Sequence, residues 1–114
     1  MSAITTHVLD TSRGRPASGL AVVLEMQTDE HDWRIVGRGA TDDDGRLRNL
    51  LPDDVSLEAA TYRLRFDTGG YFSSQNLAGF YPEVAIIFRV HDAAQHYHVP
   101  LLLSPFGYST YRGS

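Results

Sequence analysis

The chain contains no cysteine, and this absence excludes several kinds of chemistry at once. Without a thiol among its 114 residues, it can form no disulfide, no thiolate zinc site and no cysteine nucleophile, and nothing in it requires an oxidising compartment. A chain of this length is expected to form one domain, residues 1–114, that buries roughly two-thirds of its unfolded surface on folding. A hydrophobic core is therefore expected to suffice without crosslinks.

An excess of positive charge is also missing. The chain has 10 arginine and lysine residues against 14 aspartate and glutamate residues, which gives a net charge of −4 at pH 7. Both signs are scattered along the sequence, so no basic face is available to follow phosphates. We predict no nucleic-acid partner.

Long hydrophobic runs are absent as well. No window approaches the length of a membrane span, and the first residues, Met-Ser-Ala-Ile-Thr-Thr-His, have neither the basic segment nor the apolar segment of a secretory leader. The final Arg-Gly-Ser differs from the peroxisomal Ser-Lys-Leu. We expect a protein that starts near Met1, resides in the cytoplasm and has no membrane partner.

What the sequence does contain is a series of short runs rich in Val, Ile, Thr, Tyr and Phe, separated by turn-forming residues. Seven or eight strands are predicted, over 3–10, 20–27, 33–41, 46–50, 61–67, 83–90, 95–103 and 108–112. We expect the first three to form a meander, and 83–90, which is almost continuously apolar, to be covered on both faces. One short helix is predicted within 71–78, ending at Gly79. This pattern predicts an all-β sandwich.

Three histidines lie in predicted strands. His7 shares a strand face with Thr5, and by itself it favours a structural role over a proton-exchanging one, for which it needs partners elsewhere. His96 and His98 project to one side of their strand, with Tyr97 facing away. Two imidazoles are too few for a metal site, so we predict no metal, and one functional histidine beside one bystander.

The segment Asp42-Asp43-Asp44-Gly45-Arg46 does not have the ligand spacing of a calcium loop. It predicts a tight turn in which Gly45 adopts positive φ. Arg46 then starts the next element at a sheet end, where it is either solvated or a fixed fork for an anion.

The last four residues are unusually rich in functional groups for a chain end. They are Tyr111, Arg112, Gly113 and Ser114. Position alone predicts a frayed tail. Aromatic anchoring by the preceding strand would instead hold these groups in place, where a phenol, a guanidinium and a hydroxyl could form a polar pocket.

Five stretches together closely resemble the 5-hydroxyisourate hydrolases, the transthyretin-related enzyme family. They are Thr6–Thr11, Asp44–Arg46, Phe80–Val84, His96–Pro105 and Tyr111–Ser114. The final Tyr-Arg-Gly-Ser is the most specific, because transthyretin shares the fold but not this ending. The resemblance implies a transthyretin-like β-sandwich of two four-stranded sheets with one short helix, assembled as a homotetramer whose two-fold channel holds the active sites. It implies no metal or organic cofactor.

The resemblance also implies an activity, which is hydrolysis of 5-hydroxyisourate to 2-oxo-4-hydroxy-4-carboxy-5-ureidoimidazoline during purine degradation from urate to allantoin. Opening a cyclic amide needs a base, a donor for the oxyanion and an acid for the leaving nitrogen. The residues carried over as catalytic are His7, Arg46 and His98, and those carried over as substrate-binding are Tyr111, Arg112, Gly113 and Ser114. Which histidine is the base stays open. The alternatives are a non-catalytic carrier of small molecules, which would need an apolar channel, and an adhesion module with a frayed tail.

Overall fold

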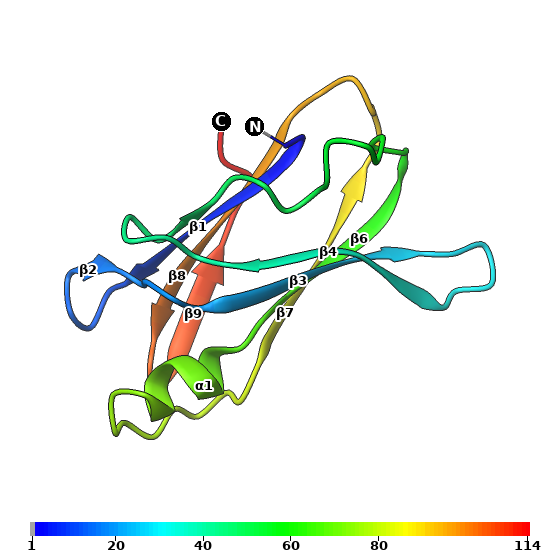
Figure 1. Cartoon of the computed structure of the whole chain (residues 1–114). Helices are drawn as coiled ribbons and strands as arrows, with labels where there is room; N and C mark the ends of the chain where they lie inside the picture. The colour runs from blue at the N-terminus through cyan, green and yellow to red at the C-terminus, as the bar shows by residue number, and fades with distance from the viewer. Residues whose placement is uncertain (1) are drawn as a thin grey trace.

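A computed structural model describes residues 2–114, which form two β-sheets packed face to face with one short helix at one end (Figure 1). The predicted all-β sandwich with one helix is confirmed. In chain order the elements are β1 Ile4–Asp10, β2 Arg15–Pro16, β3 Ala21–Gln27, β4 Trp33–Ala40, β5 Arg46–Leu47, β6 Ala60–Phe66, α1 Thr68–Ser73, β7 Val84–Val90, β8 Tyr97–Ser104 and β9 Gly107–Thr110.

The first sheet has the strand order β2-β1-β8-β9 and the second β4-β3-β6-β7. Within the described residues the first sheet holds five strands rather than the four expected, because the short strands β2 and β5 both pair antiparallel with β1. β2 pairs through Leu9 and Pro16, whereas β5 pairs through Thr6 and Leu47. The second sheet has the expected four strands. We refer to these as the β1–β8 sheet and the β3–β6 sheet.

The predicted meander of the first three strands is wrong. β3 and β4 do form an antiparallel hairpin, but β1 lies in the other sheet and runs parallel to β8. The register runs from Ile4 opposite Tyr97 to Asp10 opposite Leu103. Strands so distant in sequence pair only in the finished fold, and no local pattern reports that pairing.

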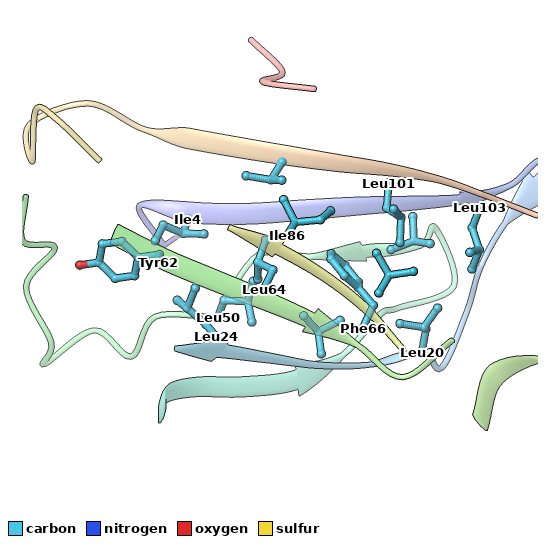
Figure 2. Close-up of a cluster of buried hydrophobic side chains, with 14 of the residues drawn as sticks. Ile4, Leu20, Leu24, Leu50, Tyr62, Leu64, Phe66, Ile86, Leu101 and Leu103 are labelled. Carbon is cyan, nitrogen blue, oxygen red and sulfur yellow. The ribbon is translucent and has the colours of Figure 1, made fainter. Parts of the chain in front are cut away.

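The core lies between the two sheets (Figure 2). Alternate residues of β1 and β8, such as Ile4 and Leu101, point inward to meet Leu24, Leu64 and Phe66 of the β3–β6 sheet, and all five are fully buried. Each such side chain contributes about 1.5–3 kcal/mol relative to an exposed position. The outward-facing residues of the same strands are therefore free to carry function.

β7 differs from its prediction. It alternates between buried and exposed residues instead of being covered on both faces: Val84, Ile86 and Val90 are buried, whereas Ile87 is 60% exposed. The cause is that the sandwich has only two layers, so that one face of β7 meets the core while no element of the described chain covers the other. An apolar strand with an uncovered face leaves room for a partner.

The helix begins and ends earlier than predicted, spanning Thr68–Ser73 rather than ending at Gly79. Its start is fixed by Asp67, whose Oδ1 accepts the Gly70 N–H at 3.0 Å. The hydroxyl of Tyr71 donates to Oδ2 of the buried Asp10 at 2.8 Å, which ties the helix to the end of β1. No helix among the described residues combines the length and apolar character needed to cross a bilayer.

The start of β1 and the C-terminus lie at the end of the sandwich opposite α1 (Figure 1). The Ser2 N–H donates to the Arg48 carbonyl at 2.8 Å, and the Gly113 N–H donates to the His98 carbonyl at 2.8 Å. The C-terminus is therefore held against β8.

Candidate active site

Three neighbouring strands of the β1–β8 sheet bring the predicted catalytic residues together. β1 carries His7, β5 carries Arg46 and β8 carries His98. His7 is directly opposite Arg46, and Thr5, two residues earlier on the same face of β1, is opposite His98. Residues remote in sequence thus share one outward-facing surface.

The turn before Arg46 forms as predicted. Asp42 Oδ1 accepts the backbone N–H groups of Asp44 at 2.9 Å and Arg46 at 3.0 Å. The Arg46 N–H, as the largest cause, lowers the pKa of the Asp42 carboxyl. Gly45 has φ of +75°, and a Cβ there would collide with the Val8 carbonyl oxygen. Only glycine fits, and the turn delivers Arg46 to its place beside His7.

His7 is oriented by the same turn. Its Nε2 lies 2.9 Å from the Asp44 carbonyl oxygen. A carbonyl only accepts hydrogen bonds, so this ring nitrogen carries a proton. This hydrogen bond fixes the orientation of the ring. In the neutral ring it places the proton on Nε2 and leaves Nδ1 unprotonated.

His98 occupies a different environment. Its pKa is lowered, first by burial and then by Coulomb interactions with Arg46, His7 and His96, while a hydrogen bond to the Thr5 backbone acts in the opposite direction. A histidine with a lowered pKa is neutral at neutral pH and can accept a proton. It therefore suits the role of a base.

A polar cavity of about 220 Å³ opens on this face. Three of the residues predicted for the site line it, namely Arg46, His98 and Ser114. His7 is not part of the lining but neighbours it through its pairing with Arg46. The residues that line it without having been predicted for the site are Thr5, Thr6, Arg48 and His96.

The last four residues lie at two different cavities. The N–H of Gly113 bonds to the His98 carbonyl, and a Cβ on Gly113 would lie 2.6 Å from His98 Cδ2. This close packing directs Ser114 into the cavity. Tyr111 and Arg112 instead line a second cavity of about 550 Å³ between β7 and the β8–β9 pair. There the Arg112 guanidinium lies 4.4 Å from the centre of the Tyr97 ring.

Four residues of the cavity had no place in the predicted site, and Thr5 and Arg48 are two of them. Thr5 appeared only as a strand neighbour of His7, and Arg48 did not appear. Thr5 shares its strand face with His7 through the two-residue period of a strand, a pattern visible in the sequence. Its contacts with His96 and His98 depend on the parallel β1–β8 pairing and were not visible.

The cavity combines a neutral base, a cation and hydroxyl groups, which suits acyl chemistry on an anionic molecule. Among residues 2–114 no group of three His, Asp or Glu side chains is arranged to hold a metal ion.

Comparison with known proteins decides the family. Residues 4–113 match the HIUase/Transthyretin family. The chain belongs to this family. A member from Caenorhabditis elegans, named a probable 5-hydroxyisourate hydrolase, is 47% identical over 113 residues, which cover 99% of this chain and 82% of the relative.

The fold alone does not separate the two branches of the HIUase/Transthyretin family. The solved 5-hydroxyisourate hydrolase of Klebsiella pneumoniae superposes with a TM-score of 0.84 at 32% identity, covering 97% of this chain and 98% of the other. Transthyretin from Sparus aurata superposes with a TM-score of 0.92 at 31% identity, covering 99% and 97%. The polar residues of the site and the higher identity to a named hydrolase distinguish the branches.

Proposed function

We propose that this chain hydrolyses 5-hydroxyisourate to 2-oxo-4-hydroxy-4-carboxy-5-ureidoimidazoline, a step in urate degradation. The observation that carries the proposal is the convergence of Arg46, His98 and Ser114 on one polar cavity beside His7. Relatives named for this activity reach 47% identity over nearly the whole chain. A carrier of apolar molecules has no need of this set of groups.

In the proposed mechanism His98 is the base. Its lowered pKa keeps the ring neutral, so that it can remove a proton from the attacking water. Arg46 holds the anionic substrate and offsets the charge that develops on the carbonyl oxygen. His98 then returns this proton to the leaving ring nitrogen, while His7, held by the Asp44 carbonyl, orients the substrate beside Arg46 and Ser114 positions it.

We propose in addition that the chain assembles as a homotetramer. β7 and β9 are edge strands, which offer unpaired backbone groups to another chain. Large apolar side chains are exposed near these edges, including Ile87 at 60%, Phe80 at 68% and Phe106 at 76%. Exposed apolar surface of this kind marks interaction sites. Light scattering after size exclusion tests the proposal, and a monomer at micromolar concentration would contradict it.

The activity is tested with 5-hydroxyisourate made in place by urate oxidase, following its ultraviolet absorbance. The substrate also decays spontaneously, so the measurement compares decay with and without the protein. Decay that accelerates in proportion to protein concentration supports the hydrolase. Binding of the molecule without faster decay would instead support the carrier, and H98A at equal concentration is the matched control.

A further inference from the structure

Thr5 occupies an unusual place for an outward-facing residue of a sheet. It is only 4% exposed, because imidazole rings cover it. Its hydroxyl oxygen lies 2.8 Å from Nδ1 of His98 and 3.3 Å from Nε2 of His96. One buried hydroxyl thus connects the base of the proposed mechanism to an exposed second histidine.

A hydroxyl has one proton, which limits how it can serve two ring nitrogens. If Thr5 donates to His96 Nε2, it accepts from Nδ1 of His98, and His98 then has its Nε2 lone pair free. If it donates to His98 Nδ1 instead, the neutral His98 ring carries its proton on Nε2 and that nitrogen cannot act as a base. The direction of the Thr5 hydroxyl therefore decides whether His98 can act as a base at Nε2.

The contacts of Thr5 with His98 favour the first of these two arrangements. The hydrogen bond between His98 and the Thr5 backbone favours the protonated ring, so the Thr5 group involved is an acceptor, its carbonyl oxygen. A ring nitrogen facing that carbonyl must carry a proton. Nδ1 is the ring nitrogen of His98 that contacts Thr5, at 2.8 Å from its hydroxyl, and the parallel register sets the two residues opposite each other, which favours Nδ1 as the protonated nitrogen.

We propose that Thr5 is a positioning residue that holds His98 in the tautomer with its proton on Nδ1 and its Nε2 free, and that His96 sustains this state by accepting the Thr5 hydroxyl proton. Thr5 then fixes the ring of the base and stabilises the imidazolium formed when Nε2 takes a proton from water. His96 takes no part in bond making. The consequence for catalysis rests on the proposed hydrolase function, whereas the tautomer does not.

The first test measures the tautomer directly, by the ¹⁵N shifts of His98 in protein labelled at histidine. We expect the wild type to show a protonated Nδ1 and an unprotonated Nε2 at pH above the His98 pKa. Thr5→Val removes the hydroxyl at nearly constant shape and should raise the share of the other tautomer, and Thr5→Ser should restore the wild-type pattern. His96→Ala should shift the tautomer in the same direction as Thr5→Val, because the hydroxyl is then free to donate to His98.

The second test measures turnover. Thr5→Val should lower kcat roughly five- to twentyfold, the loss of about one hydrogen bond to the base, with KM nearly unchanged, and Thr5→Ser should retain most of kcat. His91→Ala, on an exposed histidine that lines the second cavity, is the control and should change neither readout.

The results separate the two proposals. A wild-type His98 protonated on Nε2, or a Thr5→Val protein with unchanged ¹⁵N shifts and unchanged kcat, would overturn the role of Thr5. A wild-type protein that shows the expected tautomer but does not accelerate decay of 5-hydroxyisourate would overturn the proposed function and leave the tautomer assignment standing.

Discussion

The outer faces of the two sheets carry similar residue types with opposite consequences. On the β3–β6 sheet the two arginines of β6 are paired: Arg63 Nε lies 2.7 Å from Glu25 Oε1, and Arg65 Nη2 lies 2.7 Å from Glu83 Oε1. On the β1–β8 sheet, by contrast, no carboxylate of the described residues forms an ion pair with Arg46. Arg63 and Arg65 are thus neutralised by carboxylates of the same chain, whereas Arg46 retains its positive charge.

The difference teaches how to distinguish structural charge from functional charge on one fold. Glu25 is only 5% exposed and is flanked by Arg63 and by Arg65 at 3.7 Å, and Arg63 also stacks on the Trp33 ring at 4.3 Å. All these charges are satisfied within the chain. Arg46 lines a cavity together with His98, and in the proposed function the partner of its charge is the anionic substrate.

Substituting one arginine on each sheet should give the clearest test of this difference between the two outer faces. Arg46→Gln should lower turnover by about 10²–10³-fold, the usual cost of losing one donor to developing negative charge, with little change in urea unfolding. Arg63→Gln should leave turnover within about twofold, since Arg63 lies on the opposite sheet. Steady-state rates on 5-hydroxyisourate check both, and equal losses of activity in the two variants would contradict the distinction.

The contact between Gly113 and His98 offers a second test of the site on the β1–β8 sheet. Gly113→Ala places a Cβ 2.6 Å from His98 Cδ2 and 3.2 Å from Pro100 Cγ, so the ring or the chain end must move. We expect a loss of roughly tenfold to a hundredfold in kcat, because small displacements of catalytic groups are costly. Gly107→Ala, whose Cβ would meet nothing closer than Ser104 Oγ at 3.8 Å, is the control. Wild-type turnover in Gly113→Ala would exclude a role for this contact.

The sequence predicted most strands because their patterns are local. Thr61 to Asp67 alternates large apolar residues with Arg63 and Arg65, and the structure places β6 at Ala60–Phe66. β2 was not predicted, because two residues that include Pro16 give no strand pattern. The helix was placed too late, because Gly69-Gly70 resembles a break in the sequence, while the Asp67 cap that starts the helix there is visible only as a contact.

The site was predictable by residue type but not by arrangement. His7, Arg46 and His98 came from motifs, and their register on β1, β5 and β8 explains why they belong together. Thr5 reads in the sequence as an ordinary strand-forming residue, and its role follows only from a parallel pairing of distant strands. The same limit applies to Tyr111 and Arg112, which in a single chain face the second cavity.

A substitution at Arg63 on the outer face of the β3–β6 sheet should lower the stability of the protein, whereas Arg46→Gln on the β1–β8 sheet should not. In Arg63→Gln the nearly buried Glu25 loses its 2.7 Å partner and keeps only Arg65 at 3.7 Å. Because Arg63 is itself about one-quarter exposed, we expect a loss of about 1–2 kcal/mol in the free energy of unfolding. Urea denaturation measures it, with Arg34→Gln on an exposed arginine as the control. A change no larger than that of the control would show that the pair is not needed for the fold.

The smallest effect is expected in the titration of His98. Burial, as the largest cause, and the charge of Arg46, as the second, lower its pKa below the ordinary value of about 6.5. The active form is the neutral ring, so activity should persist as the pH falls below 6.5 and decline only as the pH passes the lowered pKa. Arg46→Gln removes one positive charge and should move the His98 pKa back toward 6.5, as followed by the NMR shifts of the ring. Arg63→Gln, on the opposite sheet, should leave it in place, and an equal shift in both variants would show that the two faces are not electrostatically distinct.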